Sequence, residues 1–197
     1  GLGYIGSELC KIYSGYSWND KVIVIDNRFI SERVNQLRKW NIEFIHGDIL
    51  DKELIKKYCH DADIVHHLAG ITDVPRVKSE ASVEKEKKIK IVAEEGTQNI
   101  LDVIDDNCKI IMPSTHVVYE GINEVRKDIL ENEETCPVLA YGKSKDYNEK
   151  QLKNSGKKFI IIRLGSVYGY STDTARIDIM ANFFSKMASQ NRILKLF

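Results

Sequence analysis

Short runs of β-branched residues alternate along this chain with longer segments of helical period, and this alternation limits the folds that the chain can adopt. The pattern is typical of parallel strands that are covered by helices. It predicts an α/β fold built on a parallel sheet. The five predicted strands cover residues 21–26, 42–46, 63–68, 109–112 and 158–164.

Helical segments separate several of these runs. The apolar residues Ile5, Leu9 and Tyr13 form one helical stripe, which Gly15 ends. Asp51 is placed to cap a second helix that reaches about residue 59. Two longer helices are predicted over about 79–105 and 140–154. Strands and helices are therefore expected to alternate over most of the chain.

Charge and composition disfavour several classes of protein. The 197 residues include 29 Lys plus Arg and 29 Asp plus Glu, so no net charge would attract a polyanion, and nucleic acid is not expected as a partner. The longest apolar runs, 22–25 and 159–162, are far shorter than the roughly 20 residues of a membrane helix. We expect a soluble protein with no membrane partner.

Cysteine and histidine usage gives no sign of a metal site or a disulfide framework. The four cysteines are scattered without a C-x-x-C pair, and no signal-peptide pattern opens the chain. Free thiols and a cytoplasmic location are therefore expected. The adjacent His66 and His67 would point to opposite faces of a strand, which disfavours a shared metal ion. No metal site is predicted.

The first six residues, G-L-G-Y-I-G, fit the pattern G-x-G-x-x-G, in which missing side chains allow a tight turn and the close approach of a pyrophosphate to a helix N-terminus. Asp26 ends the next predicted strand, 20 residues after Gly6, where a carboxylate can bind ribose hydroxyls. A carboxylate there repels a 2′-phosphate and favours NAD, although the nearby Arg28 keeps NADP open. The alternative is that Asp26 only begins a turn with Asn27.

Two other strand ends carry residues suited to a dinucleotide. Asp48 follows the second predicted strand, where a bound adenine could lie, although a plain turn explains the same spacing. Ala69 and Gly70 follow the third, and their small size would let the chain pass close beside a cofactor. We expect the two preceding histidines to be structural.

Tyr141 and Lys145 are four residues apart in a predicted helix and therefore share one face. A nearby ammonium favours the ionised form of a tyrosine, and such a pair can exchange a proton with a sugar hydroxyl. The preceding strand leads to Ser114 and Thr115, where a hydroxyl could hold the substrate oxygen. The alternative for both is a hydroxyl that caps a turn.

In this order, the motifs resemble the NAD-dependent epimerase/dehydratase family of extended short-chain dehydrogenases/reductases, and most of all its nucleotide-sugar epimerases. The resemblance implies a Rossmann-type, doubly wound parallel sheet. It also implies an enzyme that binds NAD and a nucleotide sugar, and homodimers are common among such relatives. The matching stretches are 1–6, 26–27, 47–48, 67–70, 96–99, 114–115, 118–119, 141–145 and 163–169.

The resemblance implies roles only for matching positions. The pyrophosphate is expected at Gly3 and Gly6, the adenosine ribose at Asp26, and the nicotinamide ribose at Lys145. The implied catalytic residues are Thr115, Tyr141 and Lys145, and the implied substrate contacts are Thr115 and Ser166. The full set of implied cofactor contacts is Gly1, Gly3, Tyr4, Ile5, Gly6, Asp26, Asn27, Asp48, Ile49, Leu68, Ala69, Gly70, Tyr141 and Lys145.

Departures from the family pattern narrow the reaction. Nucleotide-sugar 4,6-dehydratases carry Asp-Glu after the catalytic threonine, but this chain has His116 and Val117 there, which disfavours dehydration. Ser166 stands where relatives often have asparagine, so the sugar stays open. We expect an epimerase that works through a keto-sugar. The alternatives are a reductase or dehydrogenase with the same residues and, from another class, a non-catalytic sensor of NAD(P).

Both ends of the sequence predict that the chain is part of a longer protein. The glycine turn needs a strand before it, so we expect about five to seven apolar residues ahead of Gly1, in the centre of the sheet. The apolar run 192–197 ends without a turn or cap. We expect residues 1–169 to form part of the nucleotide-binding domain and residues 170–197 to begin the substrate-binding lobe.

Overall fold

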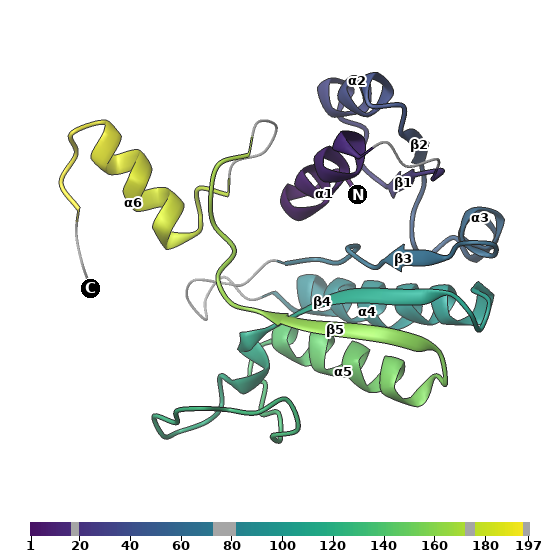
Figure 1. Ribbon diagram of the computed structural model, residues 1–197. Helices are drawn as coiled ribbons and strands as arrows, with labels where there is room; N and C mark the ends of the chain where they lie inside the picture. The colour runs from purple at the N-terminus through teal and green to yellow at the C-terminus, as the bar shows by residue number, and fades with distance from the viewer. Residues whose placement is uncertain (17–19, 73–81, 172–175, 195–197) are drawn as a thin grey trace. The chain divides into compact units, whose positions relative to one another are not determined.

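The computed structural model describes residues 1–16, 20–72, 82–171 and 176–194. The chain forms two compact units (Figure 1), each taken by itself below. The first unit contains Gly1–Gly47 and Gly165–Phe197, and the second contains Asp48–Leu164. Among the described residues, no helix is both long and apolar enough to cross a membrane.

Among its described residues, the first unit contains a two-stranded parallel sheet and three helices. Helix α1 (Tyr4–Gly15) precedes strand β1 (Ile23–Asp26), and α2 (Ser31–Lys39) connects β1 to β2 (Glu43–His46). The strands pair with Ile23 opposite Glu43. A later helix, α6 (Met180–Ser189), belongs to the same unit. The core of the unit consists of Leu2, Cys10, Val24, Val34, Leu37 and Ile42.

In the described part of the second unit, the strands form a three-stranded parallel sheet in the order β3-β4-β5. Helix α5 packs against β4 and β5, and α4 lies beside α5 (Figure 1). Asn148 and Gln151 on α5 join the two helices, since each donates a side-chain hydrogen bond to a main-chain carbonyl of α4. The elements in chain order are α3 (Lys52–Cys59), β3 (Ile64–His66), α4 (Val83–Val103), β4 (Lys109–Thr115), the 3-10 helix η2 (His116–Tyr119), α5 (Ala140–Asn154) and β5 (Lys158–Leu164).

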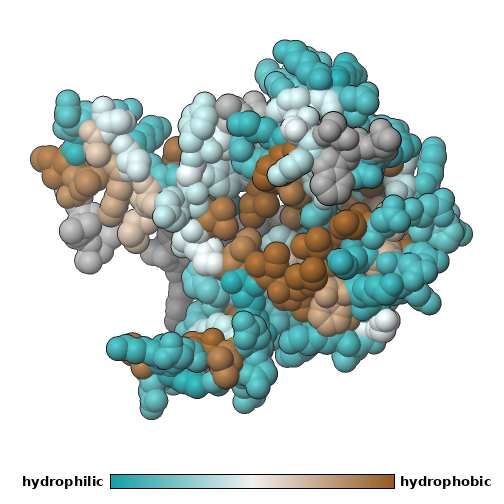
Figure 2. All heavy atoms as spheres, in the orientation of Figure 1, coloured by the Kyte–Doolittle hydropathy of each residue, from teal (hydrophilic) through white to brown (hydrophobic). Residues whose placement is uncertain are grey.

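The two faces of this sheet differ in their surroundings. Ile110, Met112 and Ser114 alternate along β4 on the face that is buried under helices. Ile160 and Ile162 of β5 pair with Ile111 and Pro113 of β4, so they lie on the opposite face, and both are exposed. Figure 2 shows apolar residues gathered over the strands of this sheet. Parallel strands are commonly apolar on both faces, which explains the composition of β5.

The structure confirms the predicted α/β fold with parallel strands. All five predicted strands are present, and β5 and α5 have the predicted bounds. Asp51 caps α3 as predicted, with its carboxylate accepting the N–H of Leu54 at 3.0 Å. Helix α4 begins at Val83, after a cap at Ser82, and the predicted start near residue 79 lies outside the described residues.

Strand β4 extends three residues beyond its predicted end at Met112. Pro113 lacks an N–H and is unfavourable inside a sheet. Strand β3 pairs with β4 only as far as Ile111, so among the described residues the segment from Pro113 to Thr115 pairs with β5 alone. A missing donor is tolerated in such an edge segment. The extension places Ser114 and Thr115 within the sheet.

Candidate functional site

The glycine turn leads directly into α1, as the sequence predicts. Gly3 is the N-cap residue, no side chain caps it, and the first turn of α1 carries no acidic residue. A Cβ atom at Gly6 would lie 2.0 Å from the carbonyl oxygen of Gly1, so the close approach of the two backbones requires glycine there. The start of α1, with Tyr4 and Ile5 in its first turn, therefore fits an anion such as a pyrophosphate.

The carboxylate of Asp26 contacts the glycine turn. Its Oδ2 atom accepts the N–H of Leu2 at 2.7 Å and lies 2.9 Å from the backbone nitrogen of Gly1. Burial raises the pKa of Asp26, and the N–H groups of Arg28 and Leu2, which bind its carboxylate, act in the opposite direction. Asp26 also accepts the N–H of Arg28 at 3.0 Å, so it begins a turn at Asn27 as well.

Asp48 and Ile49 have clear structural roles in the second unit. Asp48 Oδ1 accepts the N–H of Leu50 at 3.0 Å, which is the turn that the alternative interpretation predicted. Ile49 is buried against Gly96 of α4, and its carbonyl accepts an N–H from Asn99 at 3.1 Å. Their contacts with adenine stay a prediction.

The segment after β3 runs beside Lys145. A Cβ atom at Gly70 would lie 3.9 Å from Lys145 Nζ, and Ala69 and Gly70 are exposed while Leu68 is half-buried. His67 is buried, and its Nε2 atom lies 2.8 Å from the hydroxyl of Thr97. The second unit thus brings the small residues after β3 to the predicted catalytic lysine.

The predicted catalytic residues lie at the ends of β4 and α5. Thr115 is the last residue of β4 and is 6% exposed, and its hydroxyl accepts the N–H of Val117, which caps η2. Tyr141 and Lys145 lie in the first half of α5. Lys145 Nζ donates a hydrogen bond to the carbonyl of Pro113 at 3.0 Å, two residues before Thr115. The helix that carries the tyrosine is therefore attached to the strand that ends in the threonine.

Burial affects the pKa of Lys145. It lowers the pKa of the ammonium to about 8, although the charge of Glu149 acts in the opposite direction. A buried lysine with a perturbed pKa and a fixed hydrogen bond is typical of functional sites. Ser166, the other predicted substrate contact, follows β5 in the first unit and is exposed.

Two charged residues near Thr115 were not predicted from the sequence. Glu149 on α5 is 1% exposed, and Arg163 on β5 binds its carboxylate. The sequence contains a signal for both: Glu149 follows Lys145 by one helical turn, and Arg163 is a charge within an apolar strand. A buried charge requires a partner, which predicts that the two residues pair.

Comparisons with known proteins agree with these motifs. The sequence profile of the NAD dependent epimerase/dehydratase family matches residues 1–196. The chain is 31% identical to CDP-paratose 2-epimerase from Salmonella typhi over 69% of the chain and 41% of that protein. It is 30% identical to UDP-glucose 4-epimerase from Mycoplasma genitalium over 86% of the chain and 51% of that protein. The chain thus spans about half the length of these relatives.

A solved structure shares the fold over nearly the whole chain. UDP-glucuronic acid 4-epimerase from Bacillus cereus, solved in complex with NAD, is 26% identical, with a TM-score of 0.76. The match covers 98% of this chain and 61% of that protein. The resemblance inferred from the motifs is confirmed, and the chain belongs to the NAD dependent epimerase/dehydratase family.

Proposed function

We propose that this chain is the nucleotide-binding part of an NAD-dependent epimerase that acts on a nucleoside-diphosphate sugar. The observation that carries the proposal is the attachment of α5 to the end of β4 through Lys145 and Pro113, because it holds the tyrosine, lysine and threonine in one unit. The two curated relatives described above, both nucleotide-sugar epimerases by name, favour epimerisation over a single hydride transfer.

The residues of the first unit fit the cofactor. The glycine turn leaves the N-terminus of α1 without a side-chain cap, and Asp26 adjoins that turn with a carboxylate suited to ribose hydroxyls. Gly3 and Gly6 would hold the pyrophosphate and Asp26 the adenosine ribose. Bound NAD would supply a hydride acceptor that can also return the hydride to the sugar.

The residues of the second unit would handle the proton. In this mechanism Tyr141 removes a proton from a sugar hydroxyl, and Lys145 stabilises the resulting phenolate. Thr115 donates a hydrogen bond to the same sugar oxygen. In the reverse step Tyr141 would give the proton back to the same oxygen of the keto-sugar, and hydride supplied by bound NAD to the opposite face of the sugar would yield the epimer. The acid pair of the dehydratases is replaced by His116 and Val117, so loss of water has no matching acid here.

The test compares two tyrosines on the same helix in the full-length protein. Tyr141→Phe keeps the ring but removes the hydroxyl, so turnover of CDP- or UDP-sugars should fall by roughly 10² to 10⁴-fold. Tyr147→Phe makes the same change at a side chain of α5 that is 43% exposed, and turnover should stay at the parent's rate. Epimer formation is measured by NMR, and absorbance of reduced nicotinamide detects a reductase or dehydrogenase. Near-parent turnover in Tyr141→Phe would refute the proposed role.

A further inference from the structure

Glu149 is a charged side chain in the core of the second unit, with 1% of its surface exposed. A buried carboxylate is costly unless its oxygens are bonded and its charge is paired. Both conditions are met: Oε1 accepts the hydroxyl of Ser114 at 2.6 Å and Nε of Arg163 at 3.0 Å, and Oε2 accepts Nη2 of Arg163 at 2.6 Å. Lys153 Nζ lies 3.5 Å from Oε2.

These contacts keep the carboxylate ionised. Burial raises the pKa of Glu149, but the hydrogen bonds from Arg163 and Ser114 and the charges of Arg163 and Lys153 outweigh burial, and the net pKa is lowered. A two-pronged arginine–carboxylate pair is stronger and more directional than an ordinary hydrogen bond. Glu149 therefore fixes the position of the groups that it binds.

The partners of Glu149 are the residues next to the ends of two strands. Ser114 is the second-to-last residue of β4, Arg163 is the second-to-last residue of β5, and the two are opposite each other in the parallel ladder. One carboxylate on α5 thus joins the ends of both strands. Thr115 is the next residue after Ser114 along β4.

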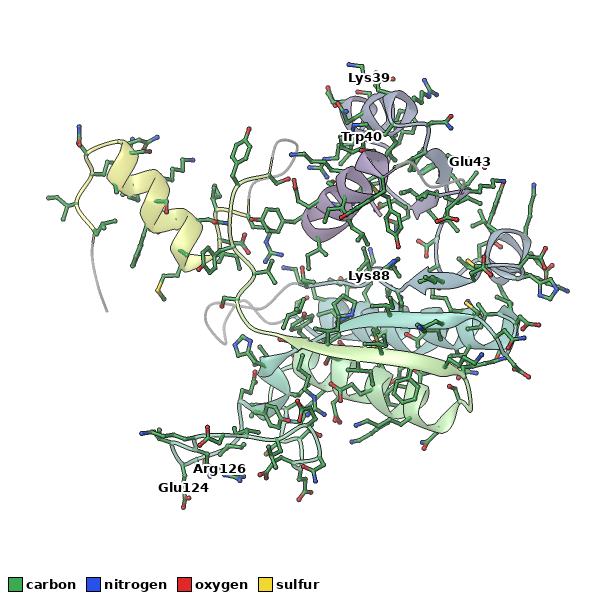
Figure 3. The ribbon with its side chains drawn as sticks, in the orientation of Figure 1. Lys39, Trp40, Glu43, Lys88, Glu124 and Arg126 are labelled. Atoms are coloured by element: carbon green, nitrogen blue, oxygen red, sulfur yellow. The ribbon has the colours of Figure 1, made fainter. Side chains whose placement is uncertain are left out.

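Arg163 also binds η2 and the segment that follows it, residues 120–139. Its Nη1 atom donates to the hydroxyl of Tyr119 and to the carbonyl of Glu131, the latter at 3.1 Å. Figure 3 shows Glu124 and Arg126 projecting from this segment away from the sheet of the second unit. Tyr119 and Glu131 are therefore connected to Glu149 through Arg163. Glu124 is exposed and does not bind Arg163.

Helix α5 is thus attached to the end of β4 at two points. Lys145 binds the carbonyl of Pro113, and Glu149, one turn further along α5, binds the hydroxyl of Ser114. These two residues of β4 come directly before Thr115. A misplacement of about 1 Å between reacting groups can lower a rate by roughly 10²-fold, so the spacing of α5 and β4 matters for the reaction.

We propose that Glu149 is a positioning residue for the reaction of this site: by binding Ser114 and Arg163, it sets where Thr115 lies relative to Tyr141 and Lys145. Glu149 acts through these neighbours and contacts no substrate. The inference rests on the proposed function of the triad. It adds Glu149, as a fourth residue, and the strand ends that Glu149 binds to the groups that determine turnover.

The experiment replaces Glu149 by glutamine in the full-length protein. Glutamine keeps the shape and one carbonyl oxygen but removes the charge that binds Arg163, so kcat should fall roughly 10- to 100-fold. KM for the nucleotide sugar and the affinity for NAD, measured by titration calorimetry, should stay close to the parent's. Ser114→Ala removes only the contact to β4 and should lower kcat in the same way, which provides a second test if Glu149→Gln does not fold. Glu124→Gln is the matched control and should keep the parent's kcat.

Parent kcat in Glu149→Gln, or in Ser114→Ala where the first variant does not fold, would overturn the inference. Losses of NAD affinity and of kcat in equal measure would also overturn it, because they indicate general damage to the fold. Crystal structures of parent and variant distinguish this failure from failure of the proposed function. If the parent epimerises no nucleotide sugar, the proposed function is wrong. In that case a displaced Thr115 in the structure of the Glu149 variant still supports the positioning role of Glu149. An unmoved Thr115 refutes that role.

Discussion

His67 directly follows β3, with its ring in the core of the second unit, and only 4% of its surface is exposed. Its Nε2 atom contacts the hydroxyl of Thr97, and its Nδ1 atom has no hydrogen-bond partner among the described residues. Burial lowers the pKa of the ring to about 3, and the nearby charge of Lys145 acts in the same direction. The folded protein therefore holds this histidine neutral.

This neutral histidine predicts a loss of stability in mild acid. In the unfolded chain the imidazole has a pKa of about 6.5 and takes up a proton below it, whereas folded His67 stays neutral until about pH 3. The contribution of neutral His67 to the free energy of unfolding is therefore present above pH 6.5 and is lost progressively as the pH falls toward 3. The loss is about 2 kcal/mol between pH 7 and pH 5.

The measurement is urea unfolding at pH 7 and pH 5. His67→Gln keeps an amide that can reach Thr97 but removes the titrating group, so its loss of stability between the two pH values should be smaller by about 2 kcal/mol. His60→Gln makes the same substitution at an exposed site of the second unit and serves as the control. An equal pH dependence in His67→Gln and the parent would contradict the prediction.

At the scale of single residues, spacing indicates candidate site residues where chemistry needs a fixed pattern. The sequence predicts the glycine turn, Asp26, and the pair Tyr141 and Lys145, because each motif has a characteristic spacing. The role of Glu149 is harder to predict from the sequence, because its partners Ser114 and Arg163 lie on two strands that only the folded sheet brings together. The structural alternatives for Asp26 and Thr115 are also present, since both residues accept main-chain hydrogen bonds.

At the scale of elements, predictions succeed where the apolar pattern is strong. Strand β5 is a run of large apolar residues, and its bounds agree with the prediction. Helix α2 was not predicted, because Val34 and Leu37 are its only buried residues and the rest of the helix is polar. Helix α6 was also missed, and none of its residues is buried, so no contact with a core marks its pattern.

The junction of the glycine turn and α1 makes a prediction at this scale. Gly6→Ala would place a methyl group 2.0 Å from the backbone oxygen of Gly1, and a backbone atom cannot move aside as a flexible side chain can. We expect the substitution to lower the free energy of unfolding by about 1–3 kcal/mol and to weaken NAD binding, because the turn must open.

Another glycine of the same helix provides the control. Gly15 is the last residue of α1, and a Cβ atom there meets nothing within 4 Å. Gly15→Ala should therefore leave NAD affinity at the parent's value and cause no loss of stability. Both quantities are measured on the full-length protein, by titration calorimetry and thermal unfolding. Equal NAD affinity in Gly6→Ala and Gly15→Ala would show that the turn does not hold the pyrophosphate.

At the scale of the whole molecule, the proposed NAD-binding residues are distributed over the chain. The glycine turn and Asp26 belong to the first unit, and Gly70, Tyr141 and Lys145 belong to the second. A ligand that binds only the folded state raises its stability in proportion to the logarithm of ligand concentration over Kd. Unfolding of the full-length protein is therefore a measure of cofactor choice that does not depend on knowing the sugar.

We expect Asp26 to determine the preference of the protein for NAD over NADP. At a free NAD concentration of about 100 times Kd, NAD should stabilise the parent by about 2.7 kcal/mol, and NADP at the same concentration should stabilise it less, because the Asp26 carboxylate repels a 2′-phosphate. Asp26→Ala removes this repulsion and the ribose hydrogen bonds. A tenfold weaker Kd would reduce the effect of NAD to about 1.4 kcal/mol, and the difference between NAD and NADP should narrow.

Asp26 also binds the backbone of the glycine turn, so the variant without ligand is expected to be less stable than the parent, and each cofactor is therefore compared with its own ligand-free protein. Asp61→Ala, at a side chain that is 97% exposed, is the matched control and should show the parent's preference. If Asp26→Ala keeps the parent's full difference between NAD and NADP, the residue only shapes the turn after β1, because a carboxylate that contacts the ribose cannot be removed without changing that difference.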